Sequence, residues 1–127
     1  MVHFDTNFLI AALQNDTSEQ RLLEEWLNED EDLAISVIAW AEFLCGPLSL
    51  DDDRLARELF PEALSLERPD AEKAASLFNA TGRRSRSLPD CLIASIALRE
   101  DADLATNNTL DFRPFCEHGL RLATVVS

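Results

Sequence analysis

The sequence has little glycine, and it lacks long apolar runs. Three glycines occur in 127 residues, with no Gly/Ser/Pro-rich linker, internal repeat or low-complexity tract. The apolar runs fall short of the about 18 residues that a membrane-spanning helix needs. The first eight residues contain Asp5 and no Lys or Arg, unlike a signal peptide. These absences predict one domain over residues 1–127, located in the cytoplasm and not in a membrane.

Soft metal ligands are also scarce. The three cysteines are Cys45, Cys91 and Cys116, and no Cys-x-x-Cys pair indicates a zinc site. Their odd number suits a reducing compartment, in which we expect the thiols to be buried as small apolar side chains. The two histidines, His3 and His118, are too few and too isolated to indicate a histidine-built metal site.

Positive charge is the third scarcity. Eleven Lys and Arg face 24 Asp and Glu, for a formal net charge of −13. A protein that binds nucleic acid by simple electrostatics is basic. A role on RNA or DNA therefore requires cations, a local basic patch, or a partner that supplies positive charge.

What the chain does have is a regular alternation of short apolar runs with helical patterns. This alternation predicts an α/β three-layer sandwich, in which helices flank a mainly parallel central sheet of about four to five strands. The strands are expected at 2–4, 32–36, 63–67, 103–106 and 121–126. The helices are expected at 6–13, 17–28, 37–45, 51–60, 69–84, 87–100 and, after a turn, within 107–112.

Sites in such sheets form beyond the carboxyl ends of the strands. That rule selects the loops Asp5-Thr6-Asn7, Ser36 onward, and Thr106-Asn107-Asn108. Asp5 is also a good helix N-cap, a role that contributes about 1 kcal/mol. Both interpretations of Asp5 stand, and they are compatible.

The other acids divide in the same way. Asp90 follows Ser87, and Asp111 follows Asn108, by three residues each, as in a loose capping box. Glu42 differs, because its neighbours in IAWAEFLCG are almost all apolar. A carboxylate buried there is costly unless it is paired or bound to a metal, and a position on the helix surface is the alternative. Four carboxylates in one pocket would repel one another, and a hard divalent cation would relieve that repulsion.

Four stretches together, FDTNFLI, WAEFLCG, LPDCLIASIA and LATNNTLDF, make a more specific pattern. In order and spacing they resemble the signature segments of the PIN-domain nucleases, and more narrowly of the VapC-like toxins of toxin–antitoxin pairs. The resemblance spans essentially the whole chain. It implies a Mg²⁺- or Mn²⁺-dependent endoribonuclease that cleaves RNA phosphodiester bonds, pairs into a homodimer, and is bound by a cognate antitoxin protein.

The same resemblance assigns roles to residues. It implies a catalytic quartet of Asp5, Glu42, Asp90 and Asp111, with Asp5 and Asp90 as metal ligands. It also implies that Thr6 and Asn108 position water, metal or phosphate. Asn108 and Asp111 remain alternative candidates for the fourth ligand.

Substrate binding has one candidate patch. Arg83, Arg84 and Arg86 precede Asp90 and could grip phosphate at the edge of the site. A basic helix end that stabilises the helix dipole is the alternative. Phe112 and Phe115 could stack a base, although core packing is the expectation from burial preferences.

Other functions compete with the nuclease interpretation. The chain could act mainly as the antitoxin-bound part of a DNA-binding repressor complex, reaching DNA only through the antitoxin. A plain interaction module leaves Glu42 unexplained. A phosphate-transferring α/β receiver needs a nucleophilic Asp with a Lys nearby, and the sole lysine, Lys73, lies in a helical pattern with no such motif.

Overall fold

The computed structural model describes residues 1–81 and 88–123. Within these ranges one sheet has the strand order β2-β1-β3-β4. Every pairing is parallel, with His3 of β1 opposite Ala34 on one side and Leu104 on the other. The strands are β1 (Val2–Phe4), β2 (Leu33–Ala34), β3 (Asp103–Ala105) and β4 (Arg121–Leu122). The predicted parallel α/β sandwich is confirmed.

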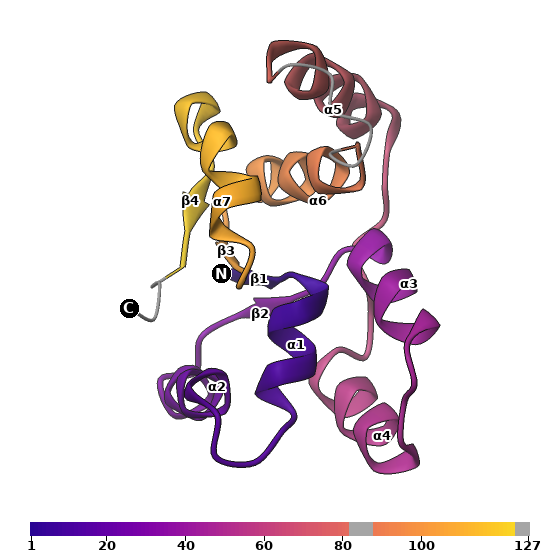
Figure 1. The fold of residues 1–127 in the computed structure, drawn as a ribbon, viewed down its shortest axis with the longest axis vertical. Helices are drawn as coiled ribbons and strands as arrows, with labels where there is room; N and C mark the ends of the chain where they lie inside the picture. The colour runs from indigo at the N-terminus through magenta and orange to yellow at the C-terminus, as the bar shows by residue number, and fades with distance from the viewer. Residues whose placement is uncertain (82–87, 124–127) are drawn as a thin grey trace.

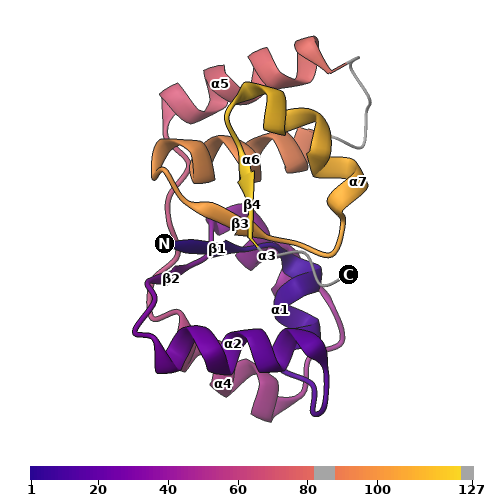
Figure 2. The same cartoon turned by 90° about the vertical axis from the view of Figure 1, so that its left-hand side faces the viewer.

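Helices cover both faces of this sheet. The helices α1, α2 and α4 lie on one side, and α5 and α6 lie on the other (Figures 1 and 2). No helix in the described ranges is long and apolar enough to cross a membrane. The bounds are α1 (Thr6–Ala12), α2 (Ser18–Asn28), α3 (Val37–Cys45), α4 (Leu50–Leu59), α5 (Arg68–Ala80), α6 (Leu88–Arg99), α7 (Thr109–Phe112) and the 3₁₀ helix η2 (Arg113–His118).

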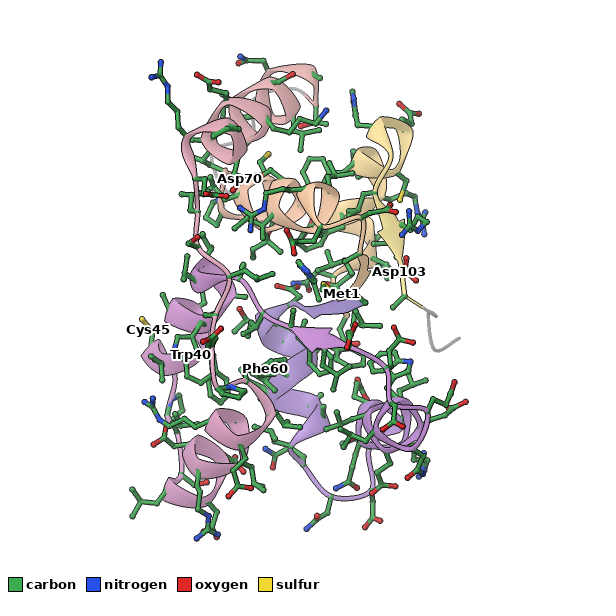
Figure 3. All side chains as sticks on the ribbon, turned by 180° about the vertical axis from the view of Figure 1, so that it is seen from behind. Met1, Trp40, Cys45, Phe60, Asp70 and Asp103 are labelled. Atoms are coloured by element: carbon green, nitrogen blue, oxygen red, sulfur yellow. The ribbon has the colours of Figure 1, made fainter. Side chains whose placement is uncertain are left out.

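Aromatic side chains join the first strand to the helices beneath it. The Phe4 ring of β1 meets Phe8, Trp26 and Phe60 edge to face, with ring centroids 5.2 to 5.7 Å apart. Phe60 follows α4 and lies beside α1 under the sheet (Figure 3). Such contacts add about 0.5–1.5 kcal/mol per pair beyond the burial of apolar area. They fix the start of α1 against the end of β1, where Asp5 lies.

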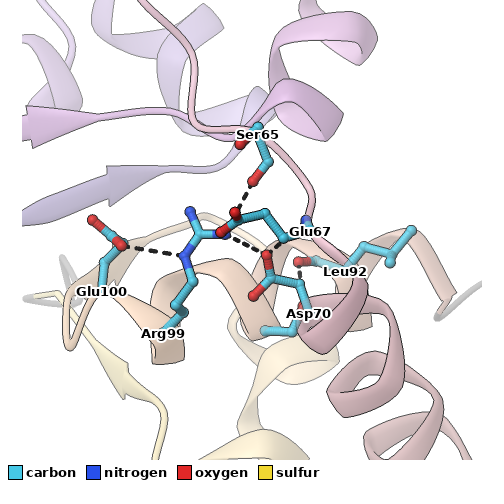
Figure 4. Close-up of polar contacts among 7 residues, drawn as sticks. Ser65, Glu67, Asp70, Leu92, Arg99 and Glu100 are labelled. Carbon is cyan, nitrogen blue, oxygen red and sulfur yellow. Dashed lines mark hydrogen bonds and ion pairs between the residues drawn. The ribbon is translucent and has the colours of Figure 1, made fainter.

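An ion-pair network fixes α6 on the other face. Arg99, at the end of α6, contacts Asp70 and Glu67 at the start of α5, the carbonyl of Ser65, and Glu100 (Figure 4). Asp70 is buried and also accepts a 2.9 Å hydrogen bond from the Glu67 amide, which completes a capping box. The network ties α6, which carries Asp90, to α5.

Some of the predicted strands are shorter than expected, and one is missing. The strand predicted at 32–36 covers only Leu33–Ala34, and the one predicted at 103–106 ends at Ala105. Residues 63–67 form no strand. Only Leu64 pairs with the segment that follows β2, in a single parallel bridge to Ser36. The chain then leaves the sheet edge to begin α5 at Arg68. The last strand ends at Leu122, although the Ala123 amide still donates to the Leu104 carbonyl at 2.7 Å. Residues 124–126, and the end of the helix predicted to reach 84, lie outside the described residues.

Burial also departs from expectation at several positions. Cys91 is buried as predicted, but Cys45 and Cys116 are exposed. Cys45 is the last residue of α3, and Cys116 lies within the short η2, of which only Phe115 is buried. Phe112 and Phe115 are buried and pack edge to face, so the core-packing interpretation is confirmed.

Candidate acidic site at the carboxyl end of the sheet

Asp5 stands between the first strand and the first helix, at the carboxyl end of β1. It is the N-cap of α1, and its Oδ1 accepts a 2.8 Å hydrogen bond from the Thr6 amide. Its Oδ2 accepts a 2.7 Å hydrogen bond from Thr106 Oγ1. The side chain is buried, which raises the pKa of its carboxyl despite these two donors. The capping role is therefore confirmed, and the carboxylate is held in one orientation from two segments.

Thr106 is the other half of this arrangement. It follows β3 directly and is buried, and its Oγ1 accepts a 2.9 Å hydrogen bond from the Asn108 amide. The adjacent β1 and β3 strands bring the two residues together, and the Asp5 amide donates to the Ala105 carbonyl at 2.9 Å. The sequence selected this loop, but it offered no sign that the Thr106 hydroxyl contacts Asp5 beyond its place at a strand end.

Glu42 reaches the site from α3. Its Oε1 accepts a 3.0 Å hydrogen bond from Thr6 Oγ1, which also lies 3.2 Å from the Ala39 carbonyl. Of the two positions that the sequence allowed for Glu42, the structure shows the one on the helix surface, because the residue is exposed. Only Ala39 and Phe43 of α3 are buried, so most of this apolar helix faces outward.

Asp90 lies in the first turn of α6 and is half-buried. Burial, followed by the charges of Asp5, Asp111 and Glu42, raises the pKa of Asp90 to about 7. The charges of the other three acids of the predicted quartet therefore act on Asp90, although the four residues come from four separate segments. The predicted capping partner of Asp90, Ser87, lies outside the described residues.

Asn108 and Asp111 belong to the turn and helix after β3. Asn108 is the N-cap of α7, but its side chain makes no capping hydrogen bond, so the loose capping box with Asp111 is not formed. Asp111 is exposed. Its charge also contributes to raising the pKa of Asp5. Arg83, Arg84 and Arg86 lie outside the described residues.

The donor set suits a hard divalent cation by its chemistry, since it consists of carboxylate, hydroxyl and amide oxygens without sulfur or imidazole. Among residues 1–81 and 88–123, however, no group of three or more His, Cys, Asp or Glu side chains is placed to hold a metal ion. The charges of Asp5, Asp111 and Glu42 nevertheless raise the pKa of Asp90. Their mutual repulsion is the electrostatic condition that a bound cation relieves.

Comparison with known proteins identifies the family. The family model described as the PIN domain matches residues 2–114, a range that includes the whole acidic quartet. The chain therefore belongs to the PIN domain family, as its four signature stretches indicate. No curated protein matches the chain.

Solved structures agree in fold. A chain of a toxin–antitoxin complex from Klebsiella pneumoniae is 29% identical, with a TM-score of 0.71 over 88% of this chain and 90% of that one. VapBC2 from Rickettsia felis, bound to a DNA fragment from their promoter, gives 22% identity and a TM-score of 0.72, covering 99% and 100%. FitAcB from Neisseria gonorrhoeae is 21% identical, with a TM-score of 0.72 over 98% of this chain and 97% of that one. The likeness to toxin–antitoxin components agrees with the resemblance to VapC-like toxins.

Proposed function

We propose that this protein is a Mg²⁺- or Mn²⁺-dependent endoribonuclease and the toxin of a toxin–antitoxin pair. The observation that carries the proposal is that Asp5, Asp111 and Glu42 all lie near enough to the half-buried Asp90 for their charges to raise the pKa of its carboxyl. Carboxylates that are only caps or solubilising charge have no reason to gather from four segments. A carboxyl whose pKa is shifted by burial and by neighbouring charges is typical of functional sites.

Each residue has a distinct role in the proposed reaction. Asp5 and Asp90 hold the cation, and Asn108 or Asp111 completes its ligands. A bound divalent cation supplies the positive charge that lowers the pKa of water and stabilises a phosphodiester transition state. Glu42, held by Thr6, accepts a proton from the attacking water. No side chain forms a covalent bond to phosphorus.

RNA must approach a chain with a net charge of −13. In this function Arg83, Arg84 and Arg86 bind the phosphates of the RNA, and the cation neutralises the charge of the acidic site. It also includes a homodimer and a cognate antitoxin. The antitoxin is supported by the likeness to a toxin–antitoxin complex at 29% identity.

A second candidate function is membership of a DNA-bound repressor complex. Two structures with the same fold are bound to DNA, namely VapBC2 with a promoter fragment and FitAB with its IR36 fragment. The acidic balance of this chain opposes direct DNA contact, so the antitoxin would supply it. The two functions are compatible, since one protein can cleave RNA when free and join a repressor when bound.

The direct test is cleavage of a mixed RNA pool by the purified chain. Wild type is expected to cut RNA with Mn²⁺ and not with EDTA, whereas Asp90→Asn should cut RNA under neither condition. The matched control Glu24→Gln removes an exposed acid of α2 and should cut like wild type. Equal cleavage by wild type and Asp90→Asn would contradict the proposal, because the activity would then come from a contaminant or another site.

A further inference from the structure

We propose that Thr106 is a positioning residue for the cation site, because one hydroxyl orients the Asp5 carboxylate and fixes the Asn108 amide at the same time. This inference rests on the proposed function, and it adds a residue to which the sequence assigned no role. Thr106 does not itself hold the cation. It acts through Asp5 on one side and through the backbone of the β3–α7 loop on the other.

The hydroxyl uses both of its hydrogen-bonding capacities. As a donor, Thr106 Oγ1 lies 2.7 Å from Asp5 Oδ2, and as an acceptor it lies 2.9 Å from the Asn108 amide nitrogen. The side chain is buried, so water does not readily replace either partner. A Thr side chain has few χ1 choices, and two simultaneous bonds select one of them.

Asp5 gains a defined orientation from this contact. Its Oδ1 is held by the Thr6 amide and its Oδ2 by Thr106, so the carboxylate plane is fixed at both oxygens. A carboxylate oxygen has two lone pairs. One hydrogen bond at each oxygen therefore leaves acceptor capacity for a cation.

The loop itself does not depend on Thr106 alone. The Asn107 side chain donates a 2.9 Å hydrogen bond to Glu19 Oε2 at the start of α2. The Asp5 amide also bonds the Ala105 carbonyl at 2.9 Å, which fastens the loop's first end to β1. Removal of the Thr106 hydroxyl should therefore disturb orientation within the site more than the fold.

The test compares Thr106→Val, which keeps the shape, with Thr106→Ser, which keeps the hydroxyl. Calorimetric titration with Mn²⁺ should give a Kd about 10-fold or more weaker for Thr106→Val, the usual effect of losing a partner of a metal ligand. Thr106→Ser should bind like wild type. The control Thr81→Val removes a hydroxyl that donates to the Leu77 carbonyl at 2.8 Å in α5, and it should leave the Kd unchanged.

A second readout needs neither metal nor activity. In EDTA, the Asn108 amide of wild type and Thr106→Ser should exchange slowly with solvent, and in Thr106→Val it should exchange faster with a shifted ¹⁵N resonance. If the Thr106→Val variant does not fold, the exchange rate of the Asn108 amide in the wild-type protein decides the matter. Slow exchange supports the proposal, and exchange at the rate of an exposed amide overturns it.

The outcomes separate this inference from the proposed function. Wild type that binds Mn²⁺ with an unchanged Kd in Thr106→Val overturns the positioning role alone. If Thr106→Ser binds Mn²⁺ as weakly as Thr106→Val, the positioning role is also overturned, because the loss of affinity would then come from the missing methyl group and its packing. Wild type that binds no Mn²⁺ overturns the proposed function, and the positioning role with it.

Discussion

Thr6 and Glu42 are 36 positions apart in the chain, yet Thr6 Oγ1 donates a 3.0 Å hydrogen bond to Glu42 Oε1. The contact links the first residue of α1 to the middle of α3, so an exposed glutamate is held beside Thr6, the residue that follows the buried Asp5. An exposed Glu side chain ordinarily samples several rotamers, and fixing one costs conformational entropy. The hydrogen bond offsets part of that cost and keeps the carboxylate at the site.

Removal of this hydroxyl should impair catalysis more than folding. We expect Thr6→Val to lower kcat by about 10-fold while the KM for RNA changes little, because Glu42 loses its orientation. Thr6→Ser should retain the wild-type kcat. Equal kcat values in Thr6→Val and wild type, measured at saturating Mn²⁺, would show that Glu42 needs no such support.

The raised pKa of Asp90 predicts a pH-dependent stability of the metal-free protein. Its folded pKa of about 7 lies above the ordinary value of 3.8, so the folded state keeps a proton that the unfolded state releases. Stability from this group is therefore complete below pH 3.8 and is lost as the pH rises to 7. The side chain is only half-buried, so solvent screening reduces the effect to about 1–2 kcal/mol.

Urea unfolding in EDTA at pH 5 and pH 7.5 measures this dependence. Asp90→Asn should lose less stability than wild type between the two pH values, and it should be the more stable protein at pH 7.5. Saturating Mn²⁺ should raise the stability of wild type at pH 7.5 and not that of the variant. Parallel pH profiles for both proteins in EDTA would contradict the assignment.

The Asp70–Arg99 contact predicts a structural role distant from the chemistry. Asp70 is buried, and Asp70→Ala removes both the acceptor of the Glu67 amide and a partner of Arg99. The substitution should lower the free energy of unfolding by about 2–3 kcal/mol. The control Glu72→Ala breaks an exposed pair with Arg68 and should cost less than about 0.5 kcal/mol. Similar losses in the two variants would mean that the network contributes little.

Gly119 follows the end of η2 with a φ of +104°, a backbone conformation that residues other than glycine rarely adopt. Gly119→Ala places a methyl group 3.6 Å from Leu98 Cδ2, an ordinary contact, so backbone strain is the main effect. We expect a loss of about 1–2 kcal/mol in thermal or urea unfolding. An unchanged midpoint would show that the turn relaxes at no cost.

The sequence predicted the strand-end loops because the hydrophobic period and the rule of parallel sheets depend on local pattern. The four acids as a quartet were implied by the resemblance to the PIN-domain nucleases. The structure places Asp5, Asp111 and Glu42 where their charges raise the pKa of Asp90. The roles assigned to these acids remain predictions, as do those of Thr6 and Asn108.

Other features depend on contacts between distant segments. The missing strand at 63–67 has a suitable apolar pattern, but the chain leaves the sheet edge after Leu64. The exposure of Glu42 follows from how little of α3 the rest of the molecule covers, which neighbours in sequence do not reveal. The bond from Thr106 to Asp5 spans 101 positions and depends on the β1–β3 register. Patterns of residue type specify elements, and pairing between elements specifies the site.

The central claim is that the acidic site binds a divalent cation, and calorimetric titration with Mn²⁺ of wild type and folded Asp5→Asn tests it most directly. The account predicts binding by wild type, and binding at least about 10-fold weaker in the variant, which loses one charge of a carboxylate ligand. Absence of binding by wild type at millimolar Mn²⁺ would contradict the account. The acids would then be caps and surface charge, and the partners of this chain would have to explain its function.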